Sequence, residues 1–176
     1  LGAFFAVLTI FVFLLSLRTT LVAAVSIPLS ILIALLVMGV TGLTINIITL
    51  GALAVAVGRV VDDSIVVLEN IFRHRARGDA IGDAVLSGTR EVAAAITSST
   101  ITTVAVFLPI GFVGGIVSQF FLPFGLTVTF ALLASLLVAL TVIPVLAFFF
   151  MRKVNVKLDA NGELPDFSFI EPNMLI

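Results

Sequence analysis

Residues 45–72 read INIITLGALAVAVGRVVDDSIVVLENIF, an apolar run that contains two adjacent aspartates, Asp62 and Asp63. A helix needs about 20 apolar residues to cross the hydrocarbon core of a bilayer, so this run is long enough. A carboxylate placed inside that core costs at least about 2.5 kcal/mol, and ionisable residues there are by default functional. The segment therefore predicts a membrane helix that carries a proton relay, an ion path or a buried charge partner.

The whole chain has the composition of a membrane protein. Of its 176 residues 61% are hydrophobic and 11% are charged, with a mean hydropathy of +1.34, whereas soluble domains contain about 25% charged residues. The net charge of −1, with no basic arm, argues against nucleic acid as a partner. The chain has no cysteine and a single histidine, His74, which excludes thiolate metal sites and a histidine-built metal centre. We expect no cofactor or metal.

Further apolar runs on both sides extend the pattern to five predicted spans, at residues 1–17, 21–40, 45–72, 92–113 and 120–151. The predicted fold is an all-α membrane protein, a polytopic bundle of about five transmembrane helices. We assign residues 1–152 to this bundle and residues 153–176 to the start of a cytoplasmic linker, where a turn signal at 159–162 and two prolines follow. The chain starts without a methionine or a signal peptide, and we expect a fragment of a longer protein.

Basic residues mark the cytoplasmic side of membrane helices. Connectors 41–44 and 114–119 carry no charge. With five crossings, all the basic residues outside the spans fall on one side: Arg18, Arg73, Arg75, Arg77, Arg90, Arg152, Lys153 and Lys157. The N-terminus is therefore expected outside and the C-terminus in the cytoplasm.

The long connector, residues 73–91, predicts a short amphipathic helix on the cytoplasmic surface. Asp79 is its expected cap, Asp83 lies in its first turns, and residues 80, 81, 84 and 85 form an apolar stripe. In the third span, Ala52 and Ala56, and likewise Ala54 and Gly58, are pairs of small residues four apart, which let helices approach closely. We expect the span with the aspartates to be packed among helices.

Arg59 lies three and four residues before Asp62 and Asp63, so helical spacing brings it within reach of both. Two carboxylates this close do not both ionise cheaply, and one cation leaves one acid effectively unpaired. That acid is able to exchange a proton near neutral pH. We predict Asp62 and Asp63 as a proton relay that titrates as a unit, with Arg59 as candidate counter-ion. The alternative is a neutralised salt bridge without turnover, which needs only one acid.

The fourth span contains a run of hydroxyl residues at positions 97–100, 102 and 103. Thr97, Ser98 and Thr100 are candidates for a hydrated path beside the aspartates. In the alternative, the hydroxyls bond the preceding helical turn and have no further role. For Glu69, near the cytoplasmic end of the third span, an interfacial cap or linker contact is favoured over a relay role.

An enzyme is disfavoured. Intramembrane aspartyl proteases also use two aspartates, but they need them on facing helices around one water. Adjacent residues on one helix point about 100° apart. The sequence offers no serine–histidine pair or metal-ligand set for another chemistry.

The motif from Gly58 to Ile71, GRVVDDSIVVLENI, resembles the fourth transmembrane helix of the resistance-nodulation-division transporters, most closely the hydrophobe/amphiphile efflux branch. The resemblance covers about residues 1–153. Segment 18–30 is similar to the junction between the second and third helices of that family, 42–46 to the entry to the fourth helix, and 112–120 to the loop between the fifth and sixth helices.

The resemblance implies twelve transmembrane helices in two halves, extracytoplasmic porter domains and a homotrimer in the bacterial inner membrane, working with a periplasmic adaptor and an outer-membrane channel. Such proteins export drugs, detergents and lipids against inward proton flow, with protons as the coupling ion. Their relay aspartates map onto Asp62 and Asp63. This chain would supply the second to sixth helices of the first half. The family's essential lysine lies in the second half, outside this chain. Arg59 departs from the best-known members, which have an apolar residue there.

Two other classes are kept as alternatives. One is a membrane scaffold or lipid-handling module, similar to sterol-sensing members of the superfamily, which needs no proton turnover. The other is a metal-efflux or protein-secretion relative. Metal exporters usually carry a further acid and methionine relays, and here Met38, Met151 and Met174 lie far in sequence from Asp62.

Overall fold

The computed structural model describes residues 17–112 and 114–151. Four helices make up nearly all of them: α2 (Leu17–Val40), α3 (Ile47–Ala76), α4 (Ile81–Ile110) and α5 (Gly115–Met151). The described residues contain no strand. The predicted all-α fold is therefore confirmed for this part of the chain.

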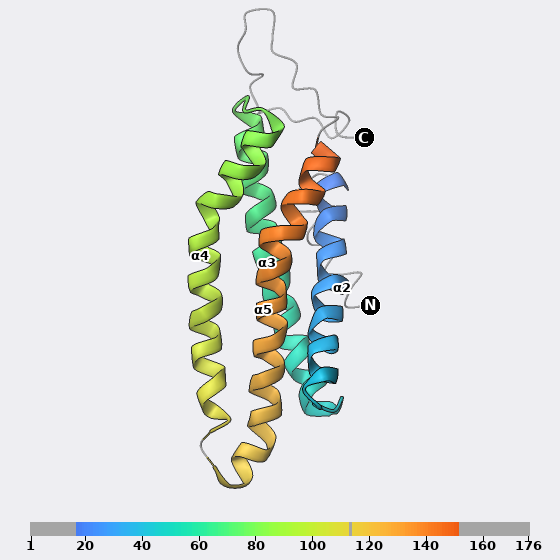
Figure 1. Ribbon diagram of the computed structural model, residues 1–176, viewed down its shortest axis with the longest axis vertical. Coiled ribbons are helices and arrows are strands. Elements are labelled where there is room, and N and C mark those ends of the chain that lie inside the picture. Colours follow the sequence, from blue (N-terminus) through green and yellow to red (C-terminus); the bar gives the residue numbers. More distant parts are fainter. Residues whose placement is uncertain (1–16, 113, 152–176) are drawn as a thin grey trace, which may run out of the picture.

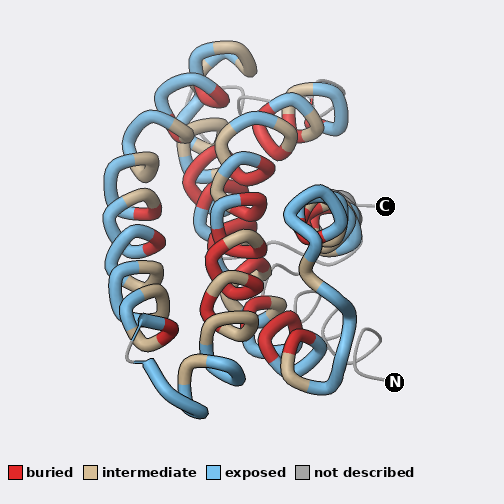
Figure 2. The backbone as a smooth tube through the Cα atoms, turned by 60° about the horizontal axis from the view of Figure 1, so that its bottom comes forward, coloured by how far each residue is buried: buried red, intermediate tan, exposed pale blue. Residues whose placement is uncertain are grey.

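The four helices run up and down, with α3 and α5 between α2 on one side and α4 on the other (Figure 1). The main core cluster joins α3 and α5 and includes Val67, Leu68, Ile71, Val138 and Ile143, each fully buried. Buried residues follow the facing sides of the helices, and exposed residues follow the outer sides (Figure 2). Hydrophobic residues therefore fill the interior of the bundle.

Local signals in the sequence explain where α3 begins and how the chain turns. Asn46 caps α3, because its side-chain oxygen accepts hydrogen bonds from the backbone of Ile48 and Thr49 at 2.9 and 3.1 Å. The hydroxyl of Thr49 in turn accepts a bond from the Asn46 backbone at 2.9 Å, which completes a capping box. Gly78, with φ at +95°, turns the chain between α3 and α4 in a conformation that other residues rarely adopt.

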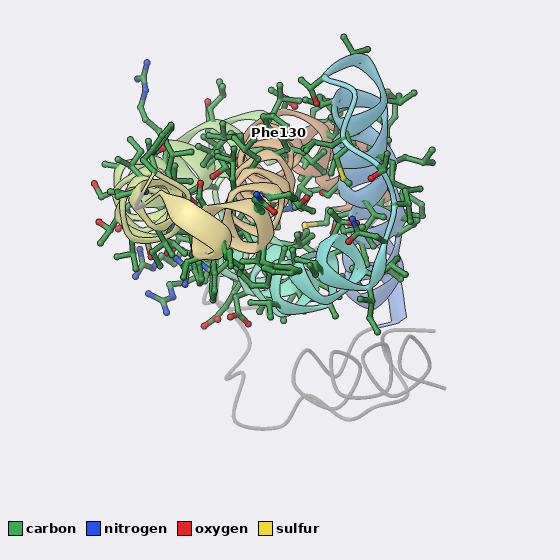
Figure 3. All side chains as sticks on the ribbon, turned by 90° about the horizontal axis from the view of Figure 1, so that it is seen from below. Phe130 is labelled. Atoms are coloured by element: carbon green, nitrogen blue, oxygen red, sulfur yellow. The ribbon has the colours of Figure 1, made fainter. Side chains whose placement is uncertain are left out.

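The outer surface of the bundle is strongly apolar. Exposed large hydrophobic residues include Val40, Ile47 and Ile116, which are 89%, 86% and 74% exposed. Seen from below, the side chains that point outward from the helices are mainly hydrocarbon (Figure 3). So large an exposed apolar surface is typical of contact with lipid or with further helices.

By length and composition, α4 and α5 are able to cross a membrane, and Ala24–Val40 is a shorter apolar stretch. Helix α3 also has 30 residues, but the charges of Arg59, Asp62 and Asp63 make its composition less apolar than that of α4 and α5. Residues 1–16, which hold nearly all of the first predicted span, lie outside the described residues. The prediction of five spans is thus supported for two helices and stays a prediction for the others.

Three boundary predictions were wrong. Residues 115–119 belong to α5 rather than to a connector. Residues 18–20 belong to α2 rather than to a connector. The predicted surface helix is the first part of α4, and α3 continues to Ala76, so only residues 77–80 connect them. Asp79 does not cap α4; the cap position is Ala80, which makes no side-chain cap bond. The Asp79 carboxylate instead bonds the ring of His74 at 2.8 Å.

The charged connectors gather at one end of the bundle. The start of α2, the connector between α3 and α4, and the end of α5 lie together in Figure 1, and the other two connectors lie at the opposite end. The uncharged segments 41–46 and 111–114 therefore face away from the basic residues Arg73, Arg75 and Arg77. The predicted linker, residues 153–176, with Arg152, Lys153 and Lys157, lies outside the described residues.

Small residues allow close helix contacts at the places where the bundle is tightest. Ala52 and Ala56 are 0% and 2% exposed, as the pairing of small residues predicted, whereas Ala54 and Gly58 face outward. A Cβ added at Gly125 of α5 would lie 2.8 Å from the carbonyl oxygen of Phe107 on α4. Only a glycine fits this contact without a shift of the backbone.

Candidate functional site

Asp63 lies inside the bundle. Its side chain faces α5 and the residue is only 4% exposed. The hydroxyl of Ser135, on α5, donates a hydrogen bond to Asp63 Oδ2 at 3.3 Å. A buried carboxylate needs such donors, because leaving it unpaired in an apolar interior is costly.

Asp62, its neighbour, is exposed on the surface of the described bundle. Successive residues of a helix point about 100° apart, which explains why one aspartate faces inward and the other outward. The two acids are neighbours in the sequence, but the structure gives them different surroundings. Asp62 is accessible to a group from outside these four helices, and Asp63 is held from within.

Arg59 is half-buried one turn before Asp63. Its guanidinium donates a hydrogen bond to the hydroxyl of Ser99 on α4. Among the described residues Arg59 forms no ion pair with Asp62 or Asp63, although its charge lies close enough to Asp63 to act on it. The direct pair that the spacing predicted is thus replaced by a contact with another helix.

Ser64, directly after the aspartates, connects to the remaining helix. Its hydroxyl lies 2.7 Å from that of Ser26 on α2 and also donates to the carbonyl oxygen of Val60 at 2.9 Å. The polar turn of α3, residues 59–64, is therefore bonded to a serine from each of the other three described helices. We call these residues the three contact serines: Ser26 of α2, Ser99 of α4 and Ser135 of α5.

Sequence reasoning did not single out Ser26, Ser64 or Ser135. A signal for two of them was present, since Ser26 and Ser135 are polar residues within long apolar runs. Burying a hydroxyl at such a position costs free energy unless it forms a hydrogen bond, so the two serines were candidates for hydrogen bonds between helices.

The predicted hydrated path does not follow one face of α4. Thr97 is half-buried, Ser98 is exposed, and Thr100 is fully buried with a hydroxyl that has no hydrogen-bond partner among the described residues. Thr102 and Thr103 donate to backbone carbonyls of their own helix, at 2.8 and 2.9 Å. These last two match the alternative in which the hydroxyls stay within α4. The path itself stays a prediction.

Glu69 lies apart from the polar turn. Its carboxylate pairs with Arg73 one turn later at 3.6 Å, and both side chains are mainly exposed. An exposed pair of this kind contributes little to stability. The pair lies within α3, and the predicted interfacial cap or linker contact of Glu69 stays a prediction.

A second polar network joins α3 to α4 at the charged end, from Asn70 near the end of the third predicted span to Asp79 in the connector. The side-chain amide of Asn70 donates to the carbonyl oxygen of Gly88 and to Glu91 Oε2, both at 2.9 Å. His74 bonds Glu91 through Nε2 at 3.0 Å and Asp79 through Nδ1 at 2.8 Å. The hydrogen bond to Glu91, followed by that to Asp79, raises the pKa of His74. The bonds from Asn70 and then His74 lower the pKa of Glu91.

Comparison with known proteins gives a consistent result. The model of the AcrB/AcrD/AcrF family matches residues 1–168. The swarming motility protein SwrC of Bacillus subtilis (strain 168) is 51% identical over 158 residues, covering 86% of this chain and 15% of SwrC. The multidrug resistance protein MdtC of Pantoea ananatis (strain AJ13355) is 41% identical over 146 residues, covering 83% of this chain and 14% of that protein.

A further relative, MdtC of Escherichia coli (strain K12), is 43% identical over 140 residues, covering 80% of this chain and 14% of that protein. The chain therefore spans 14–15% of the length of these relatives. The family model covers the polar turn of α3 and all four described helices. The resemblance inferred from the motif at residues 58–71 is confirmed: the chain belongs to the AcrB/AcrD/AcrF family of resistance-nodulation-division transporters.

Proposed function

We propose that this chain supplies half of the proton-relay bundle of a transporter that exports hydrophobic or amphiphilic compounds across the bacterial inner membrane. The observation that carries the proposal is the position of Asp63, 4% exposed in an apolar bundle and bonded by Ser135. An acid kept at such a site, beside an exposed second acid, is suited to bind and release a proton. The family supports the same role.

In the proposed cycle a proton enters from outside and neutralises Asp62 or Asp63. Neutralisation removes the attraction between that carboxylate and a cation in the second half of the same transporter. The helices then shift, because the proton stabilises one arrangement more than the other. The coupling ion is the proton, and no further cofactor is proposed.

The orientation proposed has the charged end of the bundle in the cytoplasm. The grouping of Arg73, Arg75 and Arg77 at the end opposite the uncharged connectors supports it. Residues 1–152 would then form the membrane bundle, with five spans, and residues 153–176 the start of a cytoplasmic linker. The proposed partners are the second half, two further copies in a homotrimer, a periplasmic adaptor and an outer-membrane channel.

The test is Asp63→Asn and, separately, Asp62→Asn in the complete protein that contains this chain. Each is expected to abolish export of a fluorescent amphiphilic dye that the unchanged protein exports, and to abolish the accompanying proton uptake, while leaving assembly intact. Glu69→Gln is the matched control, since it neutralises an exposed acid on the same helix. Unchanged dye export and proton uptake in both aspartate variants would favour the scaffold or lipid-handling alternative.

A further inference from the structure

Arg59 is the nearest positive charge to Asp63 in the part of the chain that the structure describes. The two residues are four apart on α3, which places them on the same side of the helix. The guanidinium charge acts on the Asp63 carboxylate without an ion pair between them. The position of this charge therefore depends on the group that the guanidinium bonds.

Other charges in these helices lie further away. By sequence α5 carries no charged residue, and the only charged residue of α2, Arg18, lies in its first turn. The charges of α4 are Asp83, Arg90 and Glu91, and the last of them is eight residues, or about 12 Å, from Ser99. On α3 itself, Asp62 is adjacent and Glu69 is paired with Arg73. Among the charged groups of the described helices, Arg59 and Asp62 are therefore the ones that act mainly on the Asp63 carboxyl group.

Ser99 is the group that holds Arg59. It accepts the hydrogen bond from the guanidinium across the contact between α3 and α4. The Nε atom of Arg59 is buried and has no hydrogen-bond partner among the described residues, so it provides no second attachment. An arginine side chain has many rotamers, and one hydrogen bond to a neighbouring helix removes much of that freedom.

We propose that Ser99 is a positioning residue that holds Arg59 as an internal counter-charge for Asp63, so that the placement of α4 sets how readily this carboxyl group takes up a proton. The proposal rests on the proposed function, in which Asp63 exchanges the coupling proton. It adds α4 to the relay, through a residue that touches neither aspartate.

The expected effect has a definite sign. A nearby cation favours the charged carboxylate, so removing or releasing it makes protonation easier and moves its midpoint to higher pH. Arg59→Met is expected to raise the midpoint by about one pH unit, and Ser99→Ala by roughly half of that. Arg59→Lys keeps the charge and Ser99→Thr keeps the hydroxyl, so both are expected to stay close to the unchanged protein.

The experiment is infrared difference spectroscopy on the complete protein in lipid vesicles, following the carboxyl C=O band as pH is lowered. The band of Asp63 is assigned by its loss in Asp63→Asn, and by its displacement in Asp63→Glu, which keeps an ionisable group. Ser98→Ala is the matched control, because it removes an exposed hydroxyl one residue from Ser99. No transported compound is needed for this measurement.

An upward shift in Arg59→Met and Ser99→Ala, absent in Ser98→Ala, supports the proposal. An unchanged midpoint in Ser99→Ala, or a loss of the folded protein with no shift in the fraction that remains, overturns it. Failure of the proposed function is a different result, namely full export by Asp63→Asn and Asp62→Asn. The two failures are distinguishable, because one is read from a band and the other from export.

Discussion

Gly88 of α4 lies against the backbone of Ile71 of α3, so close that a Cβ added at Gly88 would be 2.8 Å from the Ile71 Cα. The neighbouring Asn70 side chain bonds the Gly88 carbonyl oxygen at 2.9 Å. The absent side chain thus allows both the close approach and the hydrogen bond. This contact fixes the two helices together near the charged end of the bundle.

Gly88→Ala is expected to lower the free energy of unfolding by about 1–3 kcal/mol, because the added methyl group meets backbone atoms that have no room to move aside. Denaturant unfolding of the complete protein in detergent measures the change. Gly82→Ala on the same helix is the control, since a Cβ there meets nothing within 4 Å. It is expected to be neutral or to stabilise the protein by up to about 1 kcal/mol. Equal effects of the two substitutions would contradict the close contact.

The link between His74 and Glu91 is expected to depend on pH. The pKa of His74 is raised above 6.5, so its stabilisation is complete below pH 6.5 and is lost as pH rises through the raised pKa. The pKa of Glu91 is lowered below 4.5, so its stabilisation is present above pH 4.5 and is lost as pH falls through the lowered pKa. Both contributions are therefore present between pH 4.5 and 6.5.

Hydrogen exchange of the backbone amides at residues 77–80 measures this dependence. After correction for the intrinsic pH effect, exchange is expected to be slowest in that window and faster on its alkaline side. His74→Gln removes the titrating ring and should abolish the alkaline change. The same alkaline change in His74→Gln would assign the effect to another group.

Ser135→Ala removes the hydrogen bond that α5 donates to Asp63. A hydrogen bond to a charged group contributes about 1.5–3 kcal/mol, so its loss is expected to change the proton-binding equilibrium of Asp63 at least about tenfold and to lower proton-coupled export by the complete protein. Ser135→Thr, which keeps a hydroxyl, should retain more activity. Thr141→Ala is the control on the same helix, because its exposed hydroxyl bonds only a carbonyl of its own helix. A loss in Thr141→Ala as large as in Ser135→Ala would argue against a specific role for Ser135.

The contact between Ser26 and Ser64 is expected to couple α2 to α3 weakly. A double-mutant cycle with alanine at both positions should give an interaction free energy of about 0.6 kcal/mol, the average for hydrogen bonds between membrane helices. Ser30→Ala is a useful comparison. Its buried hydroxyl has no partner among the described residues, so the change should be neutral or slightly stabilising. A coupling of zero would show that the two hydroxyls act independently.

The sequence predicted the helices well where the apolar pattern is strong, and less well at their ends. It placed the end of the third predicted span at Phe72 because the basic residues after it resemble a loop. In the structure, Arg73, His74 and Arg75 form the last turn of α3, where positive charge interacts favourably with the helix dipole and stabilises the helix. The same mistake moved the start of α4 by about three turns. Charge alone does not separate a helix end from a connector.

At the candidate site, local spacing identified Asp62, Asp63 and Arg59 but not how they are held. The spacing predicted an ion pair within α3, whereas Arg59 bonds Ser99, which is 40 residues away in sequence. Likewise, 72 residues separate Ser135 from Asp63. Contacts of this kind depend on which helices are neighbours and how they are rotated, and a single sequence does not state either.

The lengths of α3 and α4 have a mechanical consequence. Each has 30 residues and is therefore about 45 Å long, whereas the hydrocarbon core of a bilayer is about 30 Å thick. The excess length extends both helices past the core at the charged end. There the Asn70 side chain of α3 bonds Gly88 and Glu91 of α4 and holds the two helices together. In the proposed cycle, a small tilt of these two helices at the level of Asp63 would move their ends at the charged side by a larger distance. Under the proposed function, protonation of Asp63 would thereby be converted into a larger displacement at the charged end of the bundle.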